Sequence, residues 1–343
     1  MKSTILFFCL FGFYTIASGQ QIFFTSPVPQ KKDDRRFYSS IRMQNDLLLF
    51  NANDYYLYAY DKNTQQLKWS YYLNWKSDRA PFIVNNQVWC QTTENEMVRL
   101  NAATGDTLTP LPMAYVLTTP FIKNNKAYFT CLFYGGSLTC YDLVADSVQW
   151  NKFIAHGCEK QAYFFADRII ANAEGYNWIA FDYNGNFKDK ECEGKEYNFP
   201  GELPCAEQFG LLTHDNKKFN SELLENGYDY REPDVLRTSS NTFILSTEHL
   251  MVIGDKLKIK EEIAISSLGD SLEIGGYFKI LSATNKEISF IHSNHFFRYD
   301  LPAKKLVKDI DLTNYIPHQA LLEENRLWMI AEKDGLLYGM LVQ

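Results

Sequence analysis

The chain has 343 residues, of which 46% are hydrophobic and 15% aromatic, and it carries a formal net charge of −7 at pH 7. This length is enough for one large domain or two ordinary ones, each with a sizeable core. The acidic balance excludes nucleic acid as the main partner, because no surplus of basic residues exists to displace the counterions of a phosphate backbone.

The first 19 residues have the pattern of a secretory signal peptide. Lys2 supplies a positive start, "ILFFCLFGFYTI" (5–16) is an apolar stretch, and "ASG" ends at Gly19 with small residues at the cleavage position. The apolar stretch is too short to span a bilayer comfortably. Bulky residues before Cys9 argue against a bacterial lipid anchor. We expect cleavage before Gln20, no transmembrane segment, and a periplasmic or extracellular protein.

An internal repeat follows. Similar apolar runs end at Asp61, Asn101, Asp142 and Asp182, separated by 40, 41 and 40 residues, and "FFRYD" repeats the phrase at Asp300. Each unit predicts a strand, often an Asn-Asn turn, a second strand, the anchor strand that ends on the polar residue, and an outer strand. Four short strands in about 40 residues, without an amphipathic helix between them, predict one blade of a β-propeller.

The number of blades follows from the anchor strands. Matches near positions 59, 99, 140, 180, 252, 298 and 339 predict seven blades, and a weak match near 218 favours an eighth. The last anchor strand leaves no room for an outer strand, so "QQIFFTSP" (20–27) is predicted to supply it and to close the ring. The predicted fold is all-β: residues 20–343 form one propeller of seven or eight four-stranded blades.

The recurring polar and aromatic residues are interpreted as structural. The terminal Asp or Asn of an anchor strand can accept backbone N–H groups from the following turn and fix the register. Trp69 and Trp150 each lie eight residues beyond an anchor and can cover the gap between adjacent blades, whereas Thr109 occupies the same slot in the unit between them. Recurrence at equivalent positions favours this role over a ligand site on the rim.

The phrase also carries a family resemblance. "AYDKNTQQLKW" (59–69) matches A-x-D-x-x-T-G-x-x-x-W except at Gln65, "LNAATGDTLT" (100–109) supplies the Thr-Gly pair, and "CYDLVADSVQW" (140–150) keeps the Asp and the Trp. It resembles the pyrroloquinoline-quinone-type (PQQ-like) propeller repeat, a family that includes quinoprotein dehydrogenases and cofactor-free scaffolds. The dehydrogenases usually have a longer chain and a vicinal Cys-Cys pair, both lacking here, so we expect no cofactor.

Six cysteines remain after the signal peptide, an even number that permits disulfides in an oxidising compartment. In "CLFYGGSLTC" a two-glycine turn would place Cys131 directly opposite Cys140, close enough for a bridge. The alternative is two buried free thiols. Cys192 and Cys205 flank a loop that contains Gly and Pro and form a second candidate pair. No C-x-x-C occurs, so no metal site is predicted.

The histidines are the remaining candidates for chemistry. His292 and His295 flank a tight turn in "HSNH", and His249 and His295 occupy similar slots before their anchor strands. Polar loop histidines are favoured over a zinc or proton-transfer site, and we assign no catalytic, metal or cofactor residue.

The functional prediction is a binding module. Two stretches interrupt the period and are candidate recognition loops, "KDKECEGKEYNFPGELPCAE" (188–207) and "ENGYDYREPD" (225–234). We expect a monomeric, exported PQQ-like propeller that binds or scaffolds a cell-envelope protein or glycan. The alternative is an extracytoplasmic glycan-active lyase or hydrolase with its site at the central mouth. A cluster of His, Arg, Tyr and carboxylate side chains at one end of the axis would favour the enzyme.

Overall fold

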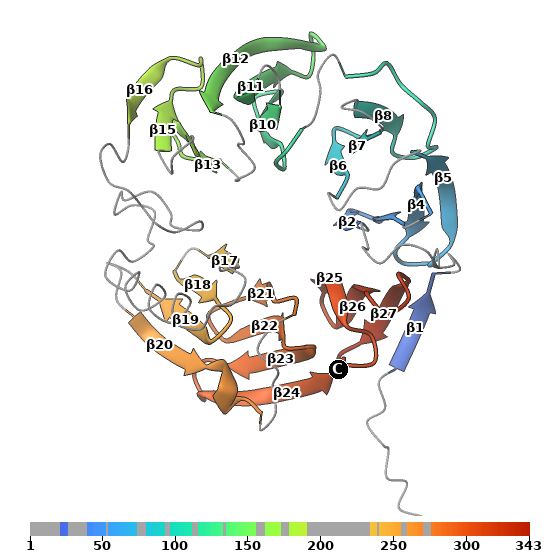
Figure 1. The fold of residues 1–343 in the computed structure, drawn as a ribbon, viewed down its shortest axis with the longest axis vertical. Coiled ribbons are helices and arrows are strands. Elements are labelled where there is room, and N and C mark those ends of the chain that lie inside the picture. The colour runs from blue at the N-terminus through green and yellow to red at the C-terminus, as the bar shows by residue number, and fades with distance from the viewer. Residues whose placement is uncertain are drawn as a thin grey trace, which may run out of the picture.

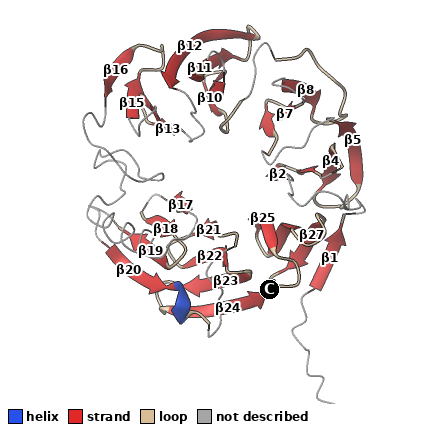
Figure 2. Ribbon diagram, viewed as in Figure 1, coloured by secondary structure: helices blue, strands red, loops and turns tan. Residues whose placement is uncertain are grey.

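The computed structural model describes residues 21–26, 40–52, 54–73, 80–92, 97–111, 116–132, 135–155, 162–172, 178–190, 234–238, 240–254, 259–269 and 276–343. Figure 1 shows small sheets arranged as a ring around a central axis. Strands make up nearly all the regular structure (Figure 2), and the one helix in these ranges is the 3-10 helix η5 (Ile265–Ser267). No helix in these ranges is long and apolar enough to cross a membrane. The all-β propeller prediction is confirmed.

Apart from the last sheet, each sheet runs in chain order from the axis outward, and neighbouring strands are antiparallel in every sheet. The first blade contains β2 (Ser40–Gln44), β3 (Leu47–Asn51), β4 (Tyr56–Asp61) and β5 (Leu67–Tyr72). The next contains β6 (Phe82–Val84), β7 (Gln87–Gln91) and β8 (Met97–Asn101). The third contains β9 (Phe121–Lys123), β10 (Lys126–Leu132), β11 (Gly136–Asp142) and β12 (Ser147–Ala155). The fourth contains β13 (Tyr163–Phe164), β14 (Ile169–Asn172), β15 (Trp178–Phe181) and β16 (Phe187–Lys190).

Three more sheets complete the described ring. One contains β17 (Asp234–Arg237), β18 (Thr242–Leu245), β19 (His249–Ile253) and β20 (Ile259–Ala264). The next contains β21 (Lys279–Ala283), β22 (Glu287–His292), β23 (His295–Asp300) and β24 (Lys305–Asp311). The last contains β25 (Pro317–Glu323), β26 (Arg326–Ala331), β27 (Leu337–Leu341) and β1 (Gln21–Thr25). Residues 191–233 lie outside the described ranges, so the preference for eight blades stays a prediction.

The N-terminal strand closes the ring, as predicted. β1 pairs antiparallel with β27, with Gln21 opposite Leu341, and supplies the outer strand of the last blade. The side chain of Phe24 packs edge-on against both Tyr60 of the first blade and Trp328 of the last, with ring centroids 5.2 and 5.4 Å apart. The closing strand therefore contributes to the apolar core at the junction of the two blades as well as to the sheet.

The anchor residues hold the turns that follow them. Asp61 accepts the backbone N–H groups of Asn63 and Thr64 at 2.9 and 2.8 Å. Asn101, Asp142, Asp182 and Asp300 each accept at least one backbone N–H of their own turn in the same way. Hydrogen bonds from backbone N–H groups hold the pKa of Asp61 and of Asp142 below the ordinary value.

The two outer-strand tryptophans join adjacent blades. Trp69 donates its indole N–H to the Ala102 carbonyl of the next blade at 3.0 Å, and Trp150 donates to the Tyr183 carbonyl at 3.3 Å. In each case the ring lies over a glycine of the following turn. A Cβ on Gly105 would come within 2.8 Å of the Trp69 ring, and one on Gly185 within 2.8 Å of Trp150. The glycine of the turn and the Trp of the preceding blade are thus two halves of one contact between blades.

Between the second and third blades, the contact at the outer-strand position is polar instead. Thr109 takes the tryptophan slot there, and Asp146, with φ 52°, takes the left-handed turn position that glycine holds in the preceding blade. Arg99, only 4% exposed, makes a bidentate ion pair with Asp146 and donates its Nε to the Thr109 carbonyl. The Tyr141 hydroxyl donates to the same carboxylate at 2.6 Å. A charged contact therefore takes the place of the outer-strand tryptophan contact at this junction.

The predicted bridge between Cys131 and Cys140 is wrong. β10 and β11 pair with Leu132 opposite Gly136, which leaves three residues between the strands where a two-residue turn was expected. The register therefore moves by an odd number of positions, and this change places the two cysteines on opposite faces of the sheet.

The surroundings of the two thiols agree with this register. Cys131 lies opposite Ser137, packs toward the second blade with Trp89, and its sulfur lies 3.0 Å from the Thr139 hydroxyl. Cys140 packs toward the fourth blade. Cys90, Cys131 and Cys140 are all buried free thiols, which was the stated alternative. The second candidate pair, Cys192 and Cys205, lies outside the described residues.

Candidate functional site

The topology gives the propeller two different faces. Turns between the first and second strands, and between the third and fourth, lie at one end of each sheet. Turns between the second and third strands, together with the connections from blade to blade, lie at the other end. We call the second one the connection face. His249 and His295 are the first residues of the third strands β19 and β23, so both begin at this face, as their matching slots predicted.

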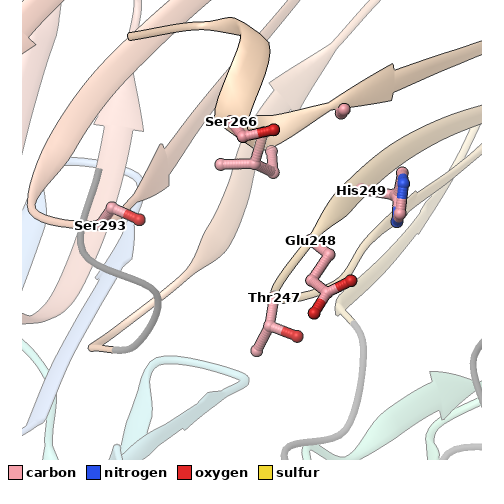
Figure 3. A pocket seen from close by; sticks show the side chains of 7 residues that line it. Thr247, Glu248, His249, Ser266 and Ser293 are labelled. Atoms are coloured by element: carbon pink, nitrogen blue, oxygen red, sulfur yellow. The ribbon is translucent and has the colours of Figure 1, made fainter. Parts of the chain in front are cut away.

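A pocket of about 300 Å³ opens on the connection face between the β17–β20 and β21–β24 blades. Figure 3 shows the hydroxyl groups of Ser266 and Ser293 on one side of it, directed toward the side that carries Thr247, Glu248 and His249. The pocket is also lined by Ala264 and Ile265.

The first wall of the pocket is the turn between β18 and β19. Ser246 organises it: its hydroxyl accepts the backbone N–H of His249 at 3.0 Å, and its own N–H donates to the His249 carbonyl at 2.9 Å. The Ile265 N–H then donates to the Glu248 carbonyl at 2.8 Å, which joins the start of η5 to this turn. The residues that line the pocket are consequently fixed by backbone bonds as well as by packing.

The second wall is the turn between β22 and β23. His292 pairs with His295 across the two residues Ser293 and Asn294, which have φ values of 49° and 60°. Two consecutive residues with positive φ form the type I′ turn that suits a two-residue hairpin. This geometry places the Ser293 side chain in the pocket and the His292 ring beneath it, against Phe278, with ring centroids 5.6 Å apart.

His292 is a buried histidine with both ring nitrogens in hydrogen bonds. It is 1% exposed, its Nε2 lies 3.1 Å from the Ser246 carbonyl, and its Nδ1 lies 2.7 Å from the Ser293 hydroxyl. A carbonyl can only accept, so Nε2 carries the proton and Nδ1 accepts from Ser293. Burial lowers the pKa of His292 to about 4, and the ring is neutral at physiological pH.

Carboxylates lie in and beside the pocket. Glu248 lines it directly, and His249 Nε2 lies 3.8 Å from the Glu262 carboxylate on the outer strand β20. Glu261, the neighbour of Glu262, accepts the Tyr299 hydroxyl at 2.8 Å. Among the described residues that line the pocket, none is a lysine or an arginine.

The hydrogen bond between Ser293 and His292 has the form of a nucleophile with its base. A base with a pKa of about 4 is weak at neutral pH, however, because catalytic bases work best with a pKa near the working pH. Within the described ranges no three His, Cys, Asp or Glu side chains gather closely enough to hold a metal ion. The Ser293–His292 pair is poorly suited to general-base catalysis at neutral pH.

Polar side chains near the axis support the inner strands. Asp234 of β17 accepts the backbone N–H of Ile280 at 2.7 Å and forms an ion pair with Lys279. The Tyr277 hydroxyl accepts the N–H of Ala320 on the next inner strand at 3.1 Å. These hydrogen bonds satisfy backbone N–H groups on inner strands, whose edges would otherwise be unpaired. The side chains that accept them are therefore already engaged in contacts between blades.

The sequence missed most of the residues that line the pocket. The histidines drew attention to "STEH" (246–249) and "HSNH" (292–295), and their equivalent slots were the available signal, but Thr247, Glu248, Ser266 and Ser293 were not singled out. The predicted recognition loops fall almost entirely outside the described residues, as do Cys158, His156 and His214; 188–190 and Asp234 belong to strands β16 and β17.

Comparison with known proteins identifies the fold and goes no further. No family model matches the chain, and no curated protein matches its sequence. Among solved structures, the computationally designed protein Ika8 is 11% identical, with a TM-score of 0.53 over 94% of this chain and 100% of that one. BamB from Moraxella catarrhalis is 12% identical, with a TM-score of 0.46 over 88% of this chain and 81% of that one. The sheets themselves define the class: the protein is a β-propeller.

Proposed function

We propose that this protein is an exported, cofactor-free, PQQ-like propeller that binds or scaffolds a cell-envelope protein or glycan through its connection face. The observation that supports this proposal best is the pocket of about 300 Å³ between the β17–β20 and β21–β24 blades. Concave sites with a few converging polar groups are where proteins usually bind ligands. Export rests on the signal-peptide pattern of residues 1–19, and the family on the repeat phrase.

The pocket also has the rigidity that a binding module needs. Its walls are a three-residue turn held by Ser246 and a type I′ turn held by His292, and both lie at the end of the apolar core shared by the two blades. A preformed site loses little conformational entropy when a ligand enters.

A screen with two readouts tests the proposal. Protein comprising residues 20–343 is immobilised and exposed to a panel of defined cell-envelope polysaccharides and purified envelope proteins, with retention and product release both measured. We expect retention without turnover. Ser266→Trp fills the pocket and should reduce retention at least about tenfold, a loss expected when a buried contact is replaced by a steric clash. Ser147→Trp, at the exposed first residue of β12, next to a third-to-fourth-strand turn on the opposite face, is the matched control.

A glycan-active lyase or hydrolase is the second candidate. The observation in its favour is the 2.7 Å hydrogen bond from Ser293 to His292 inside the pocket. If the same screen releases product from a polysaccharide, and Ser293→Gly abolishes that release while retention persists, the enzyme replaces the binding module. If Ser266→Trp leaves retention unchanged, the result argues against a site on the connection face, for the binding module and for the enzyme alike.

A further inference from the structure

Arg42 is a half-buried arginine near the axis whose charge is not balanced by a carboxylate. It lies in the middle of β2, the inner strand of the first blade, and its guanidinium carbon lies 5.8 Å from the centre of the Phe82 ring of the second blade (Figure 1). Burial holds the pKa of Arg42 below its ordinary value, and no carboxylate of the described residues acts in the opposite direction. The guanidinium still carries its charge at physiological pH, because its pKa lies far above neutrality.

One edge of this guanidinium is occupied and another is open. Nε donates to the Pro81 carbonyl at 3.2 Å, and Nη2 donates to the Thr119 hydroxyl at 3.4 Å. These two N–H groups point to the same side, so the two contacts take up the side edge of the group. The end edge, made by Nη1 and the second N–H of Nη2, has no hydrogen-bond partner among the described residues. The existing contacts therefore orient the group and leave one of its two forks available.

The open edge is accessible from the connection face. Thr119 is exposed, and so is its contact with Arg42. Pro81 and Thr119 come shortly before the inner strands β6 and β9, which begin at the connection face, so the guanidinium lies toward that end of β2. This place belongs to the first three blades and is separate from the pocket between the β17–β20 and β21–β24 blades.

We propose that the end edge of Arg42 binds the carboxylate of a small acidic ligand at the connection face. The proposal adds a second site to the proposed function and does not depend on the first. A carboxylate offers two coplanar oxygens to two parallel N–H groups and carries the single negative charge that one guanidinium balances. A phosphate is matched less well, because the groups that contact Arg42 (Pro81, Thr119 and Phe82) supply no second positive charge.

The test uses protein comprising residues 20–343 and two pairs of probes that differ in the carboxylate. N-acetylglycine is paired with its amide, and methyl α-glucuronide with methyl α-glucoside; inorganic phosphate is the fifth probe. Chemical-shift titration measures binding. We expect at least one carboxylate to bind with saturation, and its neutral partner and phosphate to bind more weakly. Which carboxylate binds more tightly tells whether a peptide or an acidic sugar is the better source of the group.

A variant and a protection experiment locate the site. Arg42→Lys keeps the charge but loses the fork, and we expect it to raise the dissociation constant of the carboxylate probe by about tenfold. Arg326→Lys is the matched control, since Arg326 is also half-buried, with its guanidinium carbon 5.9 Å from the centre of the Phe23 ring, but begins β26 at the opposite face. The thermal midpoint of each variant confirms that it is folded.

The protection experiment needs no variant. Phenylglyoxal modifies arginine side chains, and peptide mass mapping follows each site in the unaltered protein. A carboxylate probe at ten times its dissociation constant leaves about a tenth of the site free, so it should slow the modification of Arg42 by about tenfold. The modification of Arg326 should keep its rate.

Four results would overturn the proposal: no saturable binding of either carboxylate, equal binding of a neutral partner, no effect of Arg42→Lys, or no protection of Arg42. Tighter binding of phosphate than of both carboxylates would assign the edge to a phosphate group instead. The pocket is tested separately. Ser266→Trp should leave carboxylate binding unchanged, so loss of partner retention in that variant concerns the pocket alone, and loss of carboxylate binding there would place the ligand in the pocket and contradict the assignment to Arg42.

Discussion

The indole of Trp69 lies so close to Gly105 of the next blade that a single added methyl group would meet the ring at 2.8 Å. The indole N–H donates to the Ala102 carbonyl three residues earlier in the chain, so ring and backbone are joined at two points. A large apolar side chain and a residue without one therefore form a complementary pair across the blade junction.

This contact predicts that Gly105→Ala destabilises the protein by about 2–4 kcal/mol. The φ of +77° strains any L-residue, and the new methyl group also displaces the Trp69 ring. The free energy of unfolding, measured with denaturant, checks the prediction. Gly276→Ala is the control: its φ is +84°, but its Cβ would meet only the Asn294 side chain at 3.6 Å, an ordinary contact. Equal losses for the two variants would mean that the indole contact contributes nothing.

The ion pair between Arg99 and Asp146 predicts that stability depends on acid. Hydrogen bonds from Arg99 and Tyr141 lower the pKa of Asp146 to about 2 from an ordinary 3.8. A depressed carboxyl pKa stabilises the fold above the unfolded value, and this contribution disappears as the pH falls from about 4 to about 2. Because the side chain is 46% exposed, we expect no more than about 1 kcal/mol.

Asp146→Asn should therefore lower the free energy of unfolding at pH 7 and flatten its slope between pH 4 and pH 2. Unfolding curves collected at several pH values measure both effects. Asp106→Asn removes an exposed turn carboxylate of the preceding blade and is the comparison. A wild-type slope that persists in Asp146→Asn would assign the acid sensitivity to other groups.

The buried His292 predicts that the stability of the fold also depends on pH in a second, separate range. Its pKa is lowered by burial from 6.5 to about 4, so the folded state keeps the ring neutral while the unfolded state takes up a proton. Stability is then lost as the pH falls from about 6.5 to about 4, by up to about 3 kcal/mol. The proton resonances of the ring should not titrate above pH 5 in the folded protein. His292→Phe identifies the resonance and should remove that part of the pH dependence; a ring that titrates near pH 6.5 would contradict the buried tautomer.

The three buried cysteines are predicted to be protected from chemical modification in the folded protein. Cys90, Cys131 and Cys140 are buried free thiols, and burial raises the pKa of Cys90 and of Cys140, so iodoacetamide should modify none of the three in the folded protein. All three should react in denaturant without reductant, as peptide mass mapping can show. The same map tests the pairing of Cys192 with Cys205. Any mass that links Cys131 to Cys140 would contradict the register of β10 and β11.

The repeat made the fold predictable because its signals are local. The 40-residue spacing, the Asn-Asn turns and the anchor aspartates each act within one hairpin, and Asn85 and Asn86 have the positive φ values that such a turn requires. The closing strand was predictable for a related reason, since the last unit lacked an outer strand and "QQIFF" was the unassigned segment with strand character.

The site was not predictable to the same degree because it forms between units. The contact of His292 with the Ser246 carbonyl joins two blades, and no spacing within one repeat indicates it. The cysteine error had a local cause. "YGG" is compatible with a two-residue or a three-residue turn, and the structure places a positive φ at Gly135 and begins β11 at Gly136. One ambiguous turn length moved the register and reversed the face of Cys140.

Closure by β1 has a kinetic consequence. Gln21 finds its partner at Leu341, so the first segment of the ring to leave the ribosome waits for the last one before it can pair. Contacts this distant in sequence form slowly and late. β1 stays unpaired during this wait, and the edge of β27 stays unpaired from its synthesis until closure. The time before closure is therefore when newly made copies are most exposed to aggregation.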